Sequence, residues 1–229
     1  MASNTLVEEA KADIEEKGFH KIDDSEIGTK IAVMRDSGLS FYMHHESGFQ
    51  FCRDHVLLNE YIQNIINALS SDAGSRYLLA HQGSLAAYPN HICTSRNGGE
   101  KPDILVVQAW PRNSRVTFYS GTHKAGSSLK RSGGATPLWE AAPAHLENGG
   151  YKAESVSFEH GGFVICDARI FFERHEERTY IYTYVTSSYL DQLEQLPKEK
   201  HRDIFGVQQL PASCDDAREL EKLGIYRKR

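Results

Sequence analysis

Two histidine-containing segments and one arginine are the residues of this chain best suited to chemistry. His81-Gln82-Gly83 is followed, 40 residues after His81, by Gly121 of the segment Ser120-Gly121-Thr122-His123-Lys124. An unperturbed imidazole titrates near neutral pH, so His81 could act as a general base, with Gln82 and His123 as further polar groups. Arg178 carries a planar guanidinium that can hold a carboxylate through two hydrogen bonds. The alternatives are a hydrogen-bonded core histidine and a surface arginine paired with Glu176 or Glu177.

The segment Gly161 to Thr186 connects these residues to a family. Two apolar runs, 163–166 and 179–186, flank a charged connection, which predicts a strand, a turn and a strand. The order of paired glycines, apolar run and Asp167-Ala168-Arg169 resembles the closing strands of phytanoyl-CoA dioxygenase-like proteins, which are Fe(II)/2-oxoglutarate oxygenases. The resemblance implies a mainly β protein with flanking α-helices, built on a double-stranded β-helix, which is a jelly roll of the cupin type. It also implies that Arg178 binds an anion.

The metal-binding triad that the resemblance implies is incomplete in this chain. The first histidine of the family matches His81, its carboxylate falls on Gly83 and its second histidine falls on Phe172. Non-haem iron needs two imidazoles and a carboxylate on one face, and neither glycine nor phenylalanine offers a ligand atom. We therefore expect no metal and no cofactor. The alternatives are a shift of one residue that places Glu173 at the histidine position, or ligands from His44-His45-Glu46 or His175.

Five aromatic side chains could line the cavity of such a barrel. They would present an apolar surface to a hydrophobic ligand of terpenoid or polyketide type, or they would simply fill the core. Together with Arg178 we assign to substrate binding Tyr88, Trp110, Phe172, Tyr182 and Tyr184. Asp167 and Arg169 are expected to form a structural ion pair at the rim of the barrel.

Hydrophobic periodicity predicts the elements that position these residues. Helices are expected over 4–17, from Asp54 to about Ser70, over 187–196 and over 213–223. Short strands are expected at 19–22, 30–34 and 39–43, and barrel strands at 76–80, 86–94, 104–110, 115–119 and 154–158. We expect one domain over 1–229, with a buttress over about 1–75, the barrel core over about 76–186 and C-terminal helices over about 187–229.

Composition narrows the classes of partner. The 229 residues are 40% hydrophobic and 25% charged, with a formal net charge of -5 and a pI near 6.1. These values give no electrostatic reason to bind nucleic acid or an anionic membrane. The N-terminal residues do not resemble a signal peptide and no long apolar run is present, so a cytoplasmic protein is expected. Four separated cysteines predict neither a zinc site nor a disulfide scaffold.

Three functions are compatible with these residues. The first is a metal-independent enzyme that guides a cyclisation, isomerisation or pericyclic step on a hydrophobic natural-product intermediate, because such steps need positioning and a few polar groups. The second is a non-catalytic subunit, in a homodimer or in a heterodimer with an intact oxygenase of the same family. The third is an active Fe(II)/2-oxoglutarate oxygenase with atypical ligands.

Overall fold

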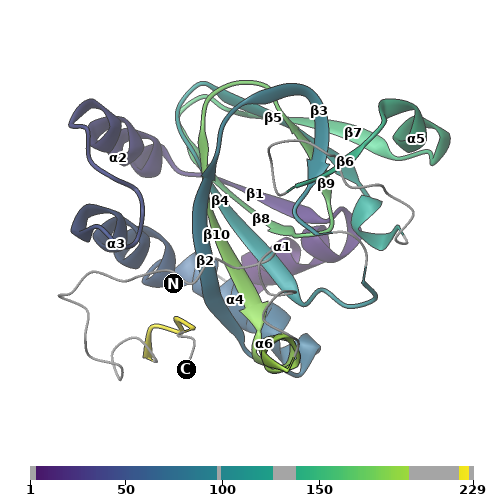
Figure 1. The fold of residues 1–229 in the computed structure, drawn as a ribbon, viewed down its shortest axis with the longest axis horizontal. Coiled ribbons are helices and arrows are strands. Elements are labelled where there is room, and N and C mark those ends of the chain that lie inside the picture. The colour runs from purple at the N-terminus through teal and green to yellow at the C-terminus, as the bar shows by residue number, and fades with distance from the viewer. Residues whose placement is uncertain (1–3, 97–98, 126–137, 196–221, 227–229) are drawn as a thin grey trace.

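Two antiparallel β-sheets of five strands each form the centre of the protein. The computed structural model, shown in Figure 1, describes residues 4–96, 99–125, 138–195 and 222–226. The strand orders are β1-β8-β4-β10-β2 and β6-β3-β9-β5-β7. The strands are β1 (Phe19–Asp23), β2 (Tyr77–Leu85), β3 (Tyr88–Thr94), β4 (Ile104–Trp110), β5 (Ser114–Ser120), β6 (Trp139–Ala141), β7 (Lys152–Phe158), β8 (Gly162–Asp167), β9 (Phe171–Arg174) and β10 (Thr179–Thr186).

The connections between the sheets make the double-stranded β-helix. From β2 to β5 and again from β8 to β10, each successive strand lies in the other sheet, so the two sheets are wound together. The expected mainly β jelly-roll fold is thereby confirmed. The expectation of a strand, a turn and a strand over 161–186 is wrong, because the charged connection contains β9. β8 and β10 do not pair with each other, since β4 lies between them and pairs with both.

Helices cover the outer face of the first sheet. These are α1 (Asn4–Glu16), α2 (Ser25–Asp36), α3 (Glu46–Cys52) and α4 (Glu60–Ala73), with a π-helical turn at Arg53–Leu57. α5 (Pro143–Asn148) packs against the second sheet instead, α6 (Ser187–Glu194) follows β10 and contacts it, and a 3-10 turn forms at Thr122–Lys124. α1 contacts α4, β1 and β8, and α4 contacts β2 (Figure 1). The helices expected over 4–17 and 187–196 are confirmed, and most of 213–223 lies outside the described residues.

The segment before the barrel is more helical than the sequence indicates. The strand expected at 30–34 lies within α2, which Asp24 caps by accepting hydrogen bonds from the backbone of Glu26 and Ile27 at 2.9 and 3.1 Å. No strand forms over 39–43. The helix expected from Asp54 is divided, because the π-helical turn ends before α4, which Asn59 caps through the backbone of Ile62 at 3.1 Å. None of the helices among the described residues is long and apolar enough to cross a membrane.

The two faces of the first sheet belong to different cores. The barrel interior holds side chains from both sheets, such as Val106, Phe118, Val164 and Phe172. The outer face of the first sheet packs its alternate residues, such as Leu105 and Val107, against the helices. Two neighbouring residues of a strand in this sheet therefore belong to different cores.

Gly28 lets α2 contact the start of β8 closely. A Cβ at this position would lie 2.0 Å from the carbonyl oxygen of His160, and a Cβ at Gly161 would lie 2.4 Å from Cα of Gly28. Gly28→Ala is expected to lower the free energy of unfolding by about 1–3 kcal/mol, because backbone must move. Urea denaturation would measure the change. A rise in stability, as alanine gives at an unobstructed helical position, would contradict this account.

Candidate functional site

The polar residues assigned to catalysis lie in three separate places. His81 on β2 pairs with Thr183 and faces the barrel interior, where it lies beside Gly83. Gln82 faces the helices instead, and its amide nitrogen donates a hydrogen bond to the carbonyl oxygen of Phe41 at 2.6 Å. Because neighbouring residues of a strand point to opposite faces, the assignment of Gln82 and His81 to one site is wrong.

Two of the five aromatic residues lie outside the barrel. Tyr182 and Tyr184 belong to the core between the first sheet and the helices, and the hydroxyl of Tyr184 accepts a hydrogen bond from the side chain of Gln63 at 3.3 Å. Their assignment as the lining of a barrel cavity is therefore wrong. On β10 the alternate residues, such as Ile181 and Val185, face the barrel interior instead.

The other three aromatic residues belong to the barrel strands and their interior. Phe172 lies near Phe118, with ring centroids 6.0 Å apart, and Trp110 stacks on Phe158 at 5.7 Å. Tyr88 pairs across the sheet with Arg174 and stacks on His91 at 3.7 Å. Their role in substrate binding stays a prediction.

Arg174 is an interior cation that the local sequence does not single out. It lies two residues after Phe172 on β9, and its guanidinium carbon lies 5.4 Å from the centre of the Phe172 ring. The side chain is 3% exposed; Nε donates to the carbonyl oxygen of Ala86 at 2.8 Å, whereas Nη1 is buried without a hydrogen-bond partner. Burial lowers the pKa of Arg174, and no carboxylate of the described residues offsets that effect.

The neighbours of Arg174 do not neutralise it. Burial raises the pKa of the nearby Cys93 thiol to about 11, so this group stays uncharged at neutral pH. A buried guanidinium without a counter-charge is costly, and an anionic ligand would supply that charge. The spacing of two between Phe172 and Arg174 is compatible with a strand that places both side chains on one face. The charged residues 176–178 that follow are instead typical of a solvated turn.

Gln108 adds a second unused donor to the interior. It lies on β4, is fully buried and pairs with the interior residues Val164 and Ile181 of the two adjacent strands. Its Oε1 accepts a hydrogen bond from Nε1 of Trp110 at 3.2 Å, while its Nε2 has no partner. A buried amide donor that is left unpaired costs stability unless something else accepts its hydrogen bond.

The residues at the positions of the family's ligands do not fit iron. Phe172 lies in the apolar interior and pairs with Cys93, not with His81, and Gly83 has no donor atom. Glu173 points to the opposite face of β9, where it accepts a hydrogen bond from the backbone of Asn90 at 2.7 Å. Within the described residues, no group of three or more His, Cys, Asp or Glu side chains could hold a metal ion.

The residues considered as alternative metal ligands lie apart from His81 and make other contacts. His44 and His45 lie just before α3, and their rings contact each other at a tilt of 44°, with centroids 4.3 Å apart. His175 is bonded to the hydroxyl of Thr117, with 2.8 Å between Nε2 and the oxygen. Arg178 is exposed and donates to the hydroxyl of Ser84 at 2.9 Å, so the alternative of a surface pair with Glu176 or Glu177 is wrong. Its anion-binding role stays a prediction.

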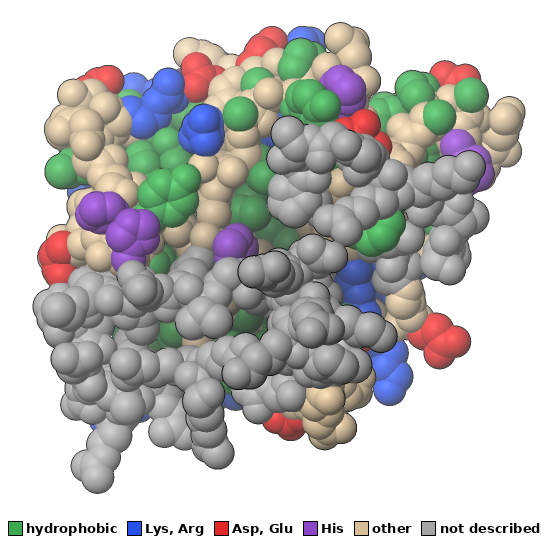
Figure 2. All heavy atoms as spheres, in the orientation of Figure 1, with side chains coloured by type: hydrophobic (Ala, Val, Ile, Leu, Met, Phe, Trp, Pro, Cys, Tyr) green, Lys and Arg blue, Asp and Glu red, His purple; other side chains and the backbone are tan. Residues whose placement is uncertain are grey.

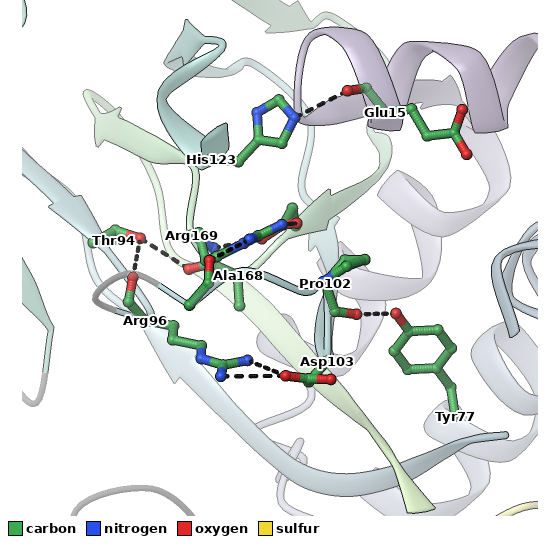
Figure 3. Close-up of polar contacts among 11 residues, drawn as sticks. Glu15, Tyr77, Thr94, Arg96, Pro102, Asp103, His123, Ala168 and Arg169 are labelled. Atoms are coloured by element: carbon green, nitrogen blue, oxygen red, sulfur yellow. Dashed lines mark hydrogen bonds and ion pairs between the residues drawn. The ribbon is translucent and has the colours of Figure 1, made fainter. Parts of the chain in front are cut away.

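A polar network closes the rim of the barrel (Figure 3). The guanidinium of Arg169 donates to both oxygens of Asp167, at 2.9 and 2.6 Å, and to the carbonyl oxygen of Gly99 at 2.7 Å. Both members of this pair are buried, which confirms the expected structural ion pair. Next to it, Arg96 contacts Asp103 at 3.3 Å. Through Asp167 and Arg169, these hydrogen bonds link the end of β8 to the connection that precedes β4.

His123 lies at this rim and does not approach the barrel interior. Its Nε2 donates to the carbonyl oxygen of Glu15 on α1 at 3.1 Å (Figure 3). Its Nδ1 is buried without a partner and faces Gly18, where an added Cβ would lie 2.6 Å away. The structure therefore does not bring His123 together with His81. Burial lowers the pKa of His123 below its ordinary value of 6.5.

The buried imidazole of His123 predicts a pH dependence of stability. The unfolded chain takes up a proton near pH 6.5, whereas folded His123 stays neutral to lower pH, so the unfolded state gains protons first. The free energy of unfolding should fall as pH drops below about 6.5, by at most about 1.4 kcal/mol per pH unit. Urea denaturation at about pH 7.5 and about pH 5.5 would measure it. An equal fall in His123→Gln would assign the dependence to other groups.

Comparison with known proteins identifies the fold. No protein-family model matches the chain, and no curated protein matches its sequence. The epimerase SnoN in complex with Fe3+, alpha ketoglutarate and nogalamycin RO matches 92% of this chain and 97% of its own, with 14% identity and a TM-score of 0.55. The non-heme alpha ketoglutarate dependent carbocyclase SnoK from nogalamycin biosynthesis matches 77% of this chain and 83% of its own, with 14% identity and a TM-score of 0.51. This chain therefore has the double-stranded β-helix fold of these non-heme α-ketoglutarate-dependent enzymes.

Proposed function

We propose that the protein is a natural-product tailoring enzyme that uses the barrel interior, without iron, to isomerise or cyclise a hydrophobic substrate carrying an anionic group. The observation that carries this proposal is Arg174, which is buried and aromatic-flanked with one guanidinium nitrogen unpartnered. The unpartnered nitrogen and the lack of a counter-charge are costly to the protein alone, whereas a bound carboxylate or enolate would supply both the acceptor and the charge.

The interior supplies the remaining groups for a proton-transfer reaction. His81 would remove a proton from a carbon beside a carbonyl group and return it at another position, so that the product is an isomer of the substrate. The free amide nitrogen of Gln108 would donate to the oxygen on which negative charge develops. Phe172 and Trp110 would contact the apolar part of the substrate. SnoN and SnoK, named as an epimerase and a carbocyclase, are precedents for such outcomes on this fold.

The test uses chelator-treated protein, without oxygen, Fe(II) or 2-oxoglutarate. Polyketide and terpenoid intermediates with a carboxylate or an enolisable carbonyl would be incubated with it and followed by liquid chromatography and mass spectrometry. We expect a product of unchanged mass, and a loss of about 10²–10⁴-fold in rate for His81→Ala. His175→Ala, which alters a histidine outside the interior, should keep the rate. Stoichiometric iron binding, or turnover only with Fe(II) and 2-oxoglutarate, would establish the oxygenase alternative.

A non-catalytic partner subunit is the second candidate. The exposed large hydrophobic side chains among the described residues all precede β2: Leu6, Val33, Leu39, Tyr42 and Leu58. Figure 2 shows hydrophobic side chains over the region of α2 and α3, interspersed with polar and charged ones. This surface would contact a second copy or a related oxygenase. Light scattering separates the candidates, because a monomer that converts substrate alone excludes an obligatory partner.

A further inference from the structure

A cavity of about 390 Å³ lies on the other side of the first sheet from the barrel interior. It is bounded by α1, α4, the start of β4 and the 3-10 turn that carries His123. Cavities of this size hold small molecules. Because Leu105 faces the cavity and the helices, while Val106 faces the barrel interior, the cavity is separate from the site proposed above.

The floor of the cavity is apolar. It consists of Ile14 from α1, Leu69 from α4 and Leu105 from β4, and the exposed Ala73 of α4 also lines the cavity. Ile14, Leu69 and Leu105 are buried core residues. An occupant would therefore place a hydrocarbon portion against them, since removing apolar surface from water favours binding.

Two lysines without an ion-pair partner among the described residues also line the cavity. Lys101 and Lys124 come from different connections, both are exposed, and neither forms an ion pair or side-chain hydrogen bond within the described part of the chain. The other charged groups differ, because Arg169 is bound to Asp167 and Asp103 is bound to Arg96. Only Glu15, an exposed carboxylate, opposes the two ammonium groups among the lining residues.

We propose that this cavity is a binding site for an amphipathic anion, an aliphatic chain that ends in a carboxylate or a phosphate. The chain lies on the floor formed by Ile14, Leu69 and Leu105, and the anionic head lies between Lys101 and Lys124. Binding is expected to weaken with added salt, since the lysines are exposed and screened.

Titration calorimetry with decanoate, decyl phosphate and 1-decanol, each as monomers in solution, tests the site. We expect both anions to bind at least about tenfold more tightly than the alcohol. A preference between the two anions distinguishes a fatty-acid ligand from a phosphate ligand. Equal binding of the alcohol would overturn the proposal, because the lysines would then contribute nothing.

Variants assign the binding to this cavity. Lys101→Ala and Lys124→Ala should each weaken decanoate binding by about threefold to tenfold, whereas Lys30→Ala on α2 should leave it unchanged. Ala73→Leu enlarges an exposed side chain that lines the cavity, so it should obstruct the cavity and abolish binding, with circular dichroism as the check that the protein is folded. Unchanged binding in both lysine variants, or in Ala73→Leu, would overturn the proposal. His81→Ala should bind decanoate normally, so the outcome does not depend on the proposed enzyme activity.

Discussion

Replacing Arg169 with methionine is expected to lower the free energy of unfolding by about 3–5 kcal/mol, because it leaves Asp167 buried without its counter-charge. The carboxylate of Asp167 is engaged through both oxygens by this one guanidinium, and its side chain is almost fully buried. Arg169→Met also removes the hydrogen bond to Gly99, which holds the connection before β4. Urea denaturation followed by circular dichroism and tryptophan fluorescence would measure the loss.

Two controls separate burial from simple loss of charge. Arg115→Met removes an arginine whose partner Glu176 is half exposed at 3.2 Å, and it should cost less than about 1 kcal/mol. The double variant Asp167→Asn with Arg169→Met should be more stable than Arg169→Met alone, because no buried charge remains unpaired. A loss in Arg169→Met no larger than in Arg115→Met would mean that the rim network does not stabilise the fold.

Strand periodicity in the sequence was enough to locate the barrel but not its interior. The run 104–110 was predicted with the bounds that β4 has, and 115–119 and 154–158 lie within β5 and β7. Alternation shows that a strand has two faces, and both faces of β10 are buried and uncharged. Which face meets the other sheet depends on the pairing with β4 and β2, which is a tertiary property. Tyr182 and Tyr184 were therefore placed in the wrong core.

The helix α2 and the strand β9 are the elements that the local sequence predicts least well. The apolar residues Ile31 and Met34 fit both a short strand and one face of α2, whose N-cap at Asp24 decides between them. For β9, a strand of four residues, the charges of Glu173 and Arg174 suggested solvent exposure. Burial of an arginine cannot be inferred from local sequence, because it depends on what surrounds the side chain. Arg178, the arginine chosen instead, is exposed.

Arg174→Met is expected to raise the free energy of unfolding by about 1–3 kcal/mol, because an unneutralised buried charge is replaced by a side chain that packs well. The carbonyl oxygen of Ala86 loses the bond from Nε, but Ala86 is exposed and water can replace that donor. The same variant should convert substrate at least about 10²-fold more slowly in the isomerisation assay, since it cannot pair with an anion. Stability and activity therefore move in opposite directions.

This opposition distinguishes a ligand-binding residue from a structural one. If Arg174 served the fold, as Arg169 does, its replacement would lower both stability and activity. Arg174→Lys keeps a positive charge on a side chain that lacks the planar fork, so it should retain part of the activity without the gain in stability. Addition of an anionic substrate should stabilise the unaltered protein against urea and leave Arg174→Met unaffected, because only the former binds it. A destabilised Arg174→Met with normal substrate binding would remove Arg174 from the site and, with it, the main support for an anionic substrate.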